Sequence, residues 1–126
     1  MEKQEKSSKN LEYFLNYIRE MIVNYNYHNG AVNVEDKRSQ DLLHELELGP
    51  SKNKDRVATK LRKSRKERRI HKDFVEINTP IYNYFVSSEG KVVIHKLEEI
   101  LGDMRKQEKQ KQNRIYVPRI KDETSI

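Results

Sequence analysis

Hydrophobic residues recur at alternating intervals of three and four along most of this chain, which is the spacing of one face of an α-helix. The first such stripe begins after Ser8, a residue suited to capping a helix N-terminus. Its members are Leu11, Leu15, Ile18, Ile22 and Tyr25. The pattern predicts a helix over residues 8–26, ended by the turn-forming sequence His28-Asn29-Gly30.

Two further helices are predicted on either side of Gly49-Pro50, a strong helix stop. The earlier one runs from Val34 or Ser39 to Leu48, and the later one from residues 53–55 to Asn78. Thr79-Pro80 is expected to kink or restart the later helix. Its first apolar face combines residues that are close together at 100° per residue: Val57, Leu61, Ser64, His71 and Val75.

A second apolar stripe on this later helix consists of Ile70, Phe74, Ile77 and Ile81. A helix with two apolar faces is expected to touch two neighbours. After a turn at 87–90, the last helix is predicted over 90–112, with a strand at 91–97 as the alternative because of its Val-Val-Ile sequence.

These elements predict an all-α protein of four to five helices, built as an elongated helical hairpin or small bundle with coiled-coil-like packing as one form. Residues 1–112 would form one helical domain and 113–126 an extended or flexible basic tail. Only 34% of residues are hydrophobic and 37% are charged, so the core must be thin. A homo-oligomer is therefore expected.

The absence of cysteine suits a reducing compartment. No secretory signal and no apolar run long enough to span a membrane is visible, so we expect a cytoplasmic protein that has no membrane partner.

Charge is unevenly distributed along the chain, whose formal net charge is +6. Residues 1–50 hold six Lys or Arg against nine Asp or Glu, and residues 51–126 hold twenty against eleven. Between residues 60 and 72, eight of thirteen residues are basic. Such an excess indicates an acidic partner, nucleic acid or protein.

Five basic residues of this run share the helix flank away from the first apolar stripe, and they are the predicted partner- or phosphate-binding residues: Arg62, Arg65, Lys66, Arg69 and Lys72. Arg68 instead falls on the apolar side, where an unpaired charge is unfavourable, so we expect it to meet a carboxylate such as Glu45 or Glu47. In the tail, Arg114, Tyr116 and Arg119 are further candidate contacts.

No constellation for catalysis, metal binding or cofactor binding is visible. His44-Glu45 lacks the second histidine of a zinc motif, and His71 on an apolar face is typical of a hydrogen-bonded core residue. The chain has no cysteine, no nucleophile elbow and no glycine-rich phosphate loop. We therefore expect no enzymatic activity, no metal and no cofactor.

Four segments carry a resemblance to small proteins encoded by phages and prophages of low-GC Gram-positive bacteria. They are residues 41–48, residues 65–69 with Lys72-Asp73, residues 100–102 with Arg105-Lys106, and residues 113–119, which together extend over about residues 40–120. The resemblance implies that the chain binds and redirects a host or defence component, and it carries over no catalytic role.

The expected function is thus that of a non-enzymatic phage protein that inhibits or modulates a host or defence complex through its basic helix face. The alternative is a regulator that binds DNA or RNA phosphates with the same face. A small-ligand sponge is a third reading, because a pocket lined from several helices leaves no contiguous motif.

Overall fold

The computed structural model describes residues 6–114, and all regular structure in that range is helical. The elements are α1 (Ser7–Leu48), the short 3₁₀ helix η1 (Ser51–Asn53), α2 (Lys54–Val86) and α3 (Ser88–Gln112). The all-α prediction is confirmed. Three long helices replace the four or five expected, and the strand alternative for 91–97 is wrong because these residues lie within α3.

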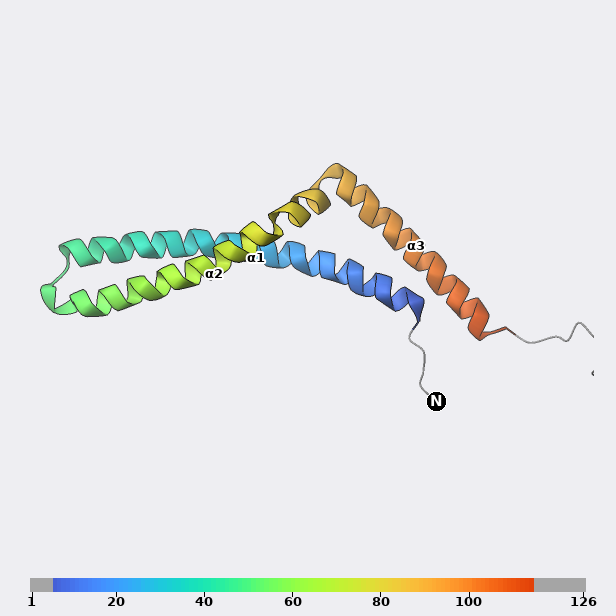
Figure 1. The fold of residues 1–126 in the computed structure, drawn as a ribbon, viewed down its shortest axis with the longest axis horizontal. Coiled ribbons are helices and arrows are strands. Elements are labelled where there is room, and N and C mark those ends of the chain that lie inside the picture. The colour runs from blue at the N-terminus through green and yellow to red at the C-terminus, as the bar shows by residue number, and fades with distance from the viewer. Residues whose placement is uncertain (1–5, 115–126) are drawn as a thin grey trace, which may run out of the picture.

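The molecule is an elongated hairpin with a third helix at its open end. α1 and α2 run antiparallel, and η1 joins them through a tight connection (Figure 1). At the end of α2 the chain turns sharply, and α3 returns toward the start of α1 (Figure 1). The predicted helical hairpin is therefore confirmed.

α1 runs without interruption through residues 28–30, so the predicted break at His28-Asn29-Gly30 is wrong. Gly30 does not adopt a positive φ, and no atom lies where an added Cβ would be. The predicted separate helix ending at Leu48 is the second half of α1. A mid-helix glycine disfavours the helix by about 1 kcal/mol, which the packing of α1 along α2 on both sides of Gly30 offsets.

The α1–α2 contact follows the seven-residue repeat of a coiled coil. Buried and half-buried positions of α1 alternate at spacings of three and four: Ile18, Met21, Tyr25, His28, Val32, Glu35, Ser39, Leu42 and Leu46. Those of α2 do the same: Val57, Leu61, Ser64, Arg68, His71, Val75, Asn78 and Tyr82. We call this contact the seam. It includes every residue of the first apolar face predicted for the basic helix.

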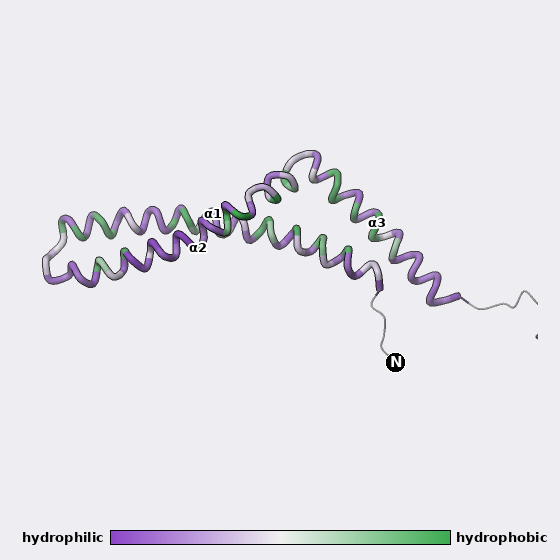
Figure 2. The backbone as a smooth tube through the Cα atoms, in the orientation of Figure 1, coloured by the Kyte–Doolittle hydropathy of each residue, from purple (hydrophilic) through white to green (hydrophobic). Residues whose placement is uncertain are grey.

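The seam is apolar near the hairpin turn and polar in the middle. Leu42, Val57 and Leu61 form a buried cluster, with Leu46 packed against it. In its middle, the sequence of α2 is mostly hydrophilic (Figure 2). The two helices must therefore hold together in that region through hydrogen bonds as well as apolar contact.

Glu35 and Ser64 form the buried centre of this polar region, with 6% and 2% of their surfaces exposed. The Ser64 hydroxyl donates to Glu35 Oε2 at 2.6 Å, and Arg38 Nη1 donates to Oε1 at 2.5 Å. Ser39 Oγ lies 3.1 Å from Ser64 Oγ and must act as donor, because the single hydroxyl hydrogen of Ser64 is already used. The buried carboxylate is thus fully satisfied.

α2 continues through Pro80 and ends at Val86, so of the kink or restart predicted at Thr79-Pro80 the restart is wrong. Proline removes one backbone hydrogen bond, but contacts on both sides of it hold the helix against α1. The rings of Tyr25 and Tyr82 stack with centroids 3.8 Å apart, and Tyr25 Oη lies 3.1 Å from Thr79 Oγ1. The rings of Phe14 and Phe85 meet edge to face at 6.4 Å.

The corner between α2 and α3 depends on Ser87 and Gly90. The Ser87 hydroxyl accepts a hydrogen bond from the Gly90 amide at 3.1 Å, so it caps α3. Gly90 is buried, and a Cβ added there would lie 1.9 Å from the carbonyl oxygen of Tyr84. Only glycine fits this approach of α3 to the end of α2.

Polar contacts connect the last turns of α3 to the first turns of α1. Ser8 was expected to be the N-cap of the first helix, but it lies inside α1. Its amide and hydroxyl donate to the Glu108 carboxylate at 3.1 and 2.5 Å, so a residue a hundred positions away satisfies a free amide of the helix start. Arg105 pairs with Glu12 at 3.1 Å, and Arg19 with Glu98 at 2.8 Å.

Two carboxyl groups at this contact, those of Glu12 and Glu108, are held in the charged form. Hydrogen bonds from Lys9 and then Arg105 lower the pKa of Glu12 below 4.5. The Ser8 hydroxyl and amide lower the pKa of Glu108 in the same direction. The polar end of α3, which has no apolar stripe, is thus positioned by charge and hydrogen bonding.

Substitution of Gly90 tests the corner. Gly90→Ala should lower the stability by about 1–3 kcal/mol, the usual consequence of overpacking, because its Cβ meets backbone that must shift. Gly102→Ala in α3 is the matched control, since nothing lies within 4 Å of its added Cβ, and it should raise the stability by up to ~1 kcal/mol. Urea denaturation measures both. Equal effects of the two changes would contradict the corner geometry.

Substitutions at Ser64 and Glu35 test the polar centre of the seam. Ser64→Ala should destabilise the fold by about 1–3 kcal/mol, because it removes a donor from a buried carboxylate. The double variant Glu35→Leu/Ser64→Ala should recover most of that loss, since neither partner then remains unpaired. Ser51→Ala, at an exposed serine, is the control in thermal unfolding. A double variant less stable than Ser64→Ala would refute this reading.

Candidate partner-binding surface

The five predicted basic residues of α2 lie together on an exposed flank of the hairpin. We call them the basic face: Arg62, Arg65, Lys66, Arg69 and Lys72. The span from Val57 to Val75 is helical, as this prediction requires. At 100° per residue the basic face lies about a third of a turn from the seam of α2, so the helix presents these side chains to solvent while its other flank holds α1.

Most of this charge is not neutralised within the part of the chain that the structure describes. Lys72 is the single member with an ion pair there, and its Nζ lies 3.9 Å from Glu76 Oε1. Ion pairs involving Arg62, Arg65, Lys66 or Arg69 are absent between residues 6 and 114. Four adjacent cations are therefore available to a partner.

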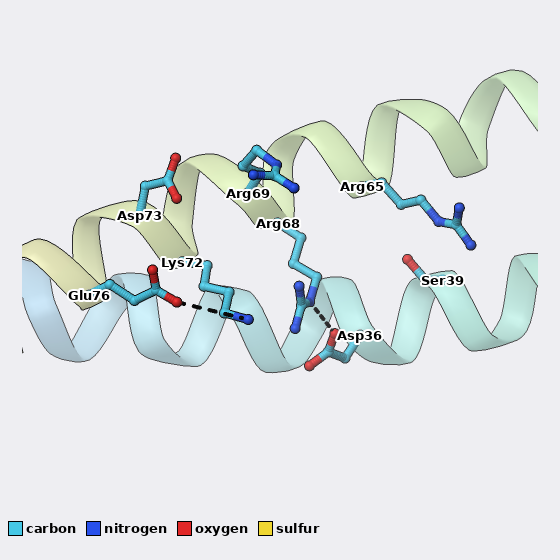
Figure 3. Close-up of a pocket in the computed structure, with 8 residues that line it drawn as sticks. All are labelled: Asp36, Ser39, Arg65, Arg68, Arg69, Lys72, Asp73 and Glu76. Atoms are coloured by element: carbon cyan, nitrogen blue, oxygen red, sulfur yellow. Dashed lines mark hydrogen bonds and ion pairs between the residues drawn. The ribbon is translucent and has the colours of Figure 1, made fainter.

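A hollow of ≈ 460 Å³ lies where the basic face meets α1. Figure 3 shows Arg68, Lys72 and Glu76 directed from α2 toward α1, and Ser39 on α1 near Arg65. The lining of this hollow contains four cations and three carboxylates: Arg65, Arg68, Arg69, Lys72, Asp36, Asp73 and Glu76. Such mixed charge favours a partner that carries donors as well as acidic groups, and it disfavours a bare phosphate in the hollow itself.

Arg68 meets a carboxylate, as predicted, but the partner is Asp36 and neither Glu45 nor Glu47. Arg68 Nε lies 2.5 Å from Asp36 Oδ1 (Figure 3). Antiparallel helices bring together residues equally distant from the turn. The turn between the two helices is centred on η1, at residues 51–53. Arg68 lies about sixteen residues after this centre and Asp36 about sixteen residues before it, so the two face each other. The sequence also contains this information, because the stop at Gly49-Pro50 sets which residues of the two helices face each other.

A second hollow of ≈ 380 Å³ lies on the outer side of the basic face. Ala58 and Leu61 contribute an apolar floor, and the aliphatic stems of Arg62, Arg65, Lys66 and Arg69 surround it. A hollow with an apolar floor and a cationic rim suits a protein side chain that inserts between the arginines. It offers no aromatic ring on which a nucleic-acid base can stack.

A pair of histidines crosses the seam beside this surface. His28 Nδ1 lies 2.7 Å from His71 Nδ1, so one ring donates to the other. Phe74 packs on His28 with ring centroids 4.2 Å apart. The pKa of His28 is lowered below 6.5, mainly by burial and secondly by the charge of nearby His71. His71 is the hydrogen-bonded core residue that was predicted, whereas its partner His28 had been assigned to a turn.

Of the three candidate residues near the C-terminus, the structure describes one. Arg114 is exposed and follows the end of α3, away from the basic face in sequence. Tyr116 and Arg119 lie outside the described residues, as does the rest of the predicted tail from residue 115 onward. The candidate partner-binding surface therefore consists of residues of α1 and α2.

Two findings on residues 6–114 bear on other kinds of site. No three His, Asp or Glu side chains there converge as metal ligands would, and His44 is exposed. None of the helices described has the combination of length and apolar sequence needed to cross a lipid bilayer.

Comparison with known proteins adds no family to this geometry: no protein-family model, curated protein or solved structure matches the chain. The function must be argued from the surface itself.

The histidine pair gives the fold a pH dependence of defined sign. The pKa of His28 is lower in the folded chain than in the unfolded chain, so the unfolded state binds the proton more readily. Stability should therefore be full above pH 6.5 and fall as the pH decreases below it, levelling off beneath the folded pKa. The stability contributed by the Glu12 and Glu108 carboxylates is lost only below pH 4.5, because folding lowers the pKa of both groups.

Urea denaturation from about pH 7.5 to about pH 5 measures this effect. His28→Gln retains a hydrogen-bonding group and cannot titrate, so it should flatten the profile. His44→Gln, at an exposed histidine of the same helix, should leave the profile unchanged. An unaltered slope in His28→Gln would contradict the assignment.

Proposed function

We propose that this chain is a non-enzymatic, phage-encoded binding protein that inhibits or modulates a host or defence macromolecular complex. It acts in the host cytoplasm and engages an acidic protein surface through the basic face. The observation that carries the proposal is the set of four exposed cations, Arg62, Arg65, Lys66 and Arg69, with no ion pair among the described residues. Charge held unpaired on a rigid helix steers and orients an oppositely charged partner.

Two features favour a protein over a nucleic acid as that partner. Three carboxylates share the first hollow with the cations, so the hollow suits a partner that carries hydrogen-bond donors among its acidic groups, as a protein surface does and a phosphate backbone does not. The second hollow has an apolar floor between arginine stems, where a partner's side chain can insert. Arginine is enriched at protein interfaces, and its planar guanidinium group forms bidentate hydrogen bonds with carboxylates.

We also infer that the chain self-associates. Many large apolar side chains remain exposed on the hairpin, among them Tyr27 at 65%, Ile70 at 60% and Ile77 at 76%. Contiguous exposure on this scale is unusual for a monomer.

Charge reversal tests the partner proposal. Immobilised full-length chain should retain one discrete protein from nuclease-treated lysate of a low-GC Gram-positive bacterium. Arg65→Glu/Arg69→Glu should weaken this capture at least about tenfold, equivalent to ~1.4 kcal/mol. The control Lys91→Glu/Lys96→Glu makes the same change of charge at exposed residues of α3 and should bind as the wild type does.

The nucleic-acid alternative is decided by the same variants. Retardation of duplex DNA by the wild type, lost steeply with added salt and lost in Arg65→Glu/Arg69→Glu, together with no protein capture, would replace the proposal with the DNA-binding function. Equal behaviour of wild type and both double variants in the two assays would exclude the basic face as a binding surface.

A further inference from the structure

The flank of the hairpin opposite the basic face carries a second set of coiled-coil positions that no part of the described chain covers fully. On α2 they follow at spacings of four and three: Ile70, Phe74, Ile77, Ile81 and Tyr84. At 100° per residue this stripe lies about a third of a turn from the seam, on the side away from Arg65 and Arg69. The sequence predicts that the stripe meets a second neighbour, but 76% of the surface of Ile77 is exposed.

α1 extends this surface beside α2. Its exposed members are Tyr13 at 55%, Tyr17 at 50%, Tyr27 at 65% and Val34 at 53%. The histidine pair shows that the two stripes adjoin: the Tyr27 ring meets His71 edge-on at 6.0 Å, and Phe74 packs on His28. α3 is no obstacle, because it contacts α1 on the other flank, through Ser8, Glu12 and Arg19. We call this combined surface the apolar face.

The apolar face is poor in charge although the chain as a whole is rich in it. Its heptad positions are 13, 17, 20, 24, 27, 31 and 34 on α1 and 70, 74, 77, 81 and 84 on α2. Among these positions Glu20 is the single charged residue, in a protein with 37% charged residues. Depletion of charge with enrichment of tyrosine is typical of the core of a protein interface.

The exposed area approaches the size that a dimer requires. A fully buried aromatic side chain covers about 150–250 Å², so the exposed parts of Tyr13, Tyr17, Tyr27 and Tyr84 together amount to roughly 300–500 Å². Val34, Ile70 and Ile77 enlarge this surface. A stable dimer buries about 800 Å² on each partner.

We propose that the apolar face binds a second copy of this chain, with the two α2 helices antiparallel and Ile77 at the two-fold axis. The stripe is nearly symmetric about Ile77, since Ile70 and Tyr84 lie seven residues to either side. The arrangement sets Ile70 against the partner's Tyr84 and Phe74 against the partner's Ile81. Along α2 the next charged position of the stripe, Glu67, would lie opposite the partner's Ser87, so the contact between the two α2 helices buries no carboxylate.

This inference rests on the self-association proposed above and specifies where it occurs. It also places both basic faces on the outside of the dimer, because they lie on the opposite flank of each hairpin. A dimer would then present two cationic surfaces to one acidic partner, which raises its apparent affinity.

Light scattering of the full chain after size-exclusion chromatography tests the proposal. The wild type should show twice the monomer mass of 15.1 kDa. Ile77→Glu should show the monomer mass at the same concentration, because it places two carboxylates at the axis. Val92→Glu is the matched control: Val92 lies on α3 and is 60% exposed, and this variant should remain a dimer. Circular dichroism confirms that each variant stays helical.

Cross-linking locates the axis, since the chain has no cysteine of its own. Under mild oxidation Ile77→Cys should form a disulfide-linked dimer at least about tenfold faster than Val92→Cys, because only residues at the axis meet their own copies. A wild-type monomer would overturn both self-association and its location. A dimer that withstands Ile77→Glu, or that cross-links no faster at 77 than at 92, would overturn the location alone.

Discussion

The register of α1 against α2 is the constraint on which the rest of the structure depends. In the middle of the seam it is set by paired polar groups: Glu35 with Ser64, Asp36 with Arg68, and His28 with His71. A slip of one heptad would bring Glu35 beside Val57 or His71 and leave Ser64 without its acceptor. Buried polar groups that lose their partners are destabilising by a few kcal/mol, so these pairs exclude alternatives that a uniformly apolar seam would tolerate.

The sequence predicted the hairpin and the basic helix because their signals are local. Gly49-Pro50 stops a helix wherever it occurs, and the separation of Val57, Leu61 and Ser64 from Arg65 and Arg69 follows from helical spacing alone. These elements appear in the structure where they were expected. The position of the basic face on the flank away from the seam was predictable for the same reason.

The continuity of α1 was not predictable from apolar periodicity. Its seam positions between Tyr25 and Leu42 include His28, Glu35 and Ser39, which no hydrophobicity pattern assigns to a buried face. Each is buried or half-buried because α2 supplies its partner, so the signal lies in the pairing of two segments. Gly30 and Pro80 were given too much weight for a related reason: tertiary packing on both sides outweighs the local preference of one residue. The Gly90 contact requires the backbone of Tyr84, which no sequence pattern shows.

The position of α3 explains why the basic face is open to a partner. α3 pairs with α1 at Ser8, Glu12 and Arg19, and so covers that flank only over the first turns of α1. The basic face lies opposite the stretch of α1 that contains Asp36 and Ser39, beyond the reach of α3. The corner at Gly90 fixes where α3 starts and in which direction it runs, and the contact between Glu108 and Ser8 fixes where it meets α1. The open stretch is thus a consequence of the path of α3, and a longer cover would have required α2 to end several turns earlier.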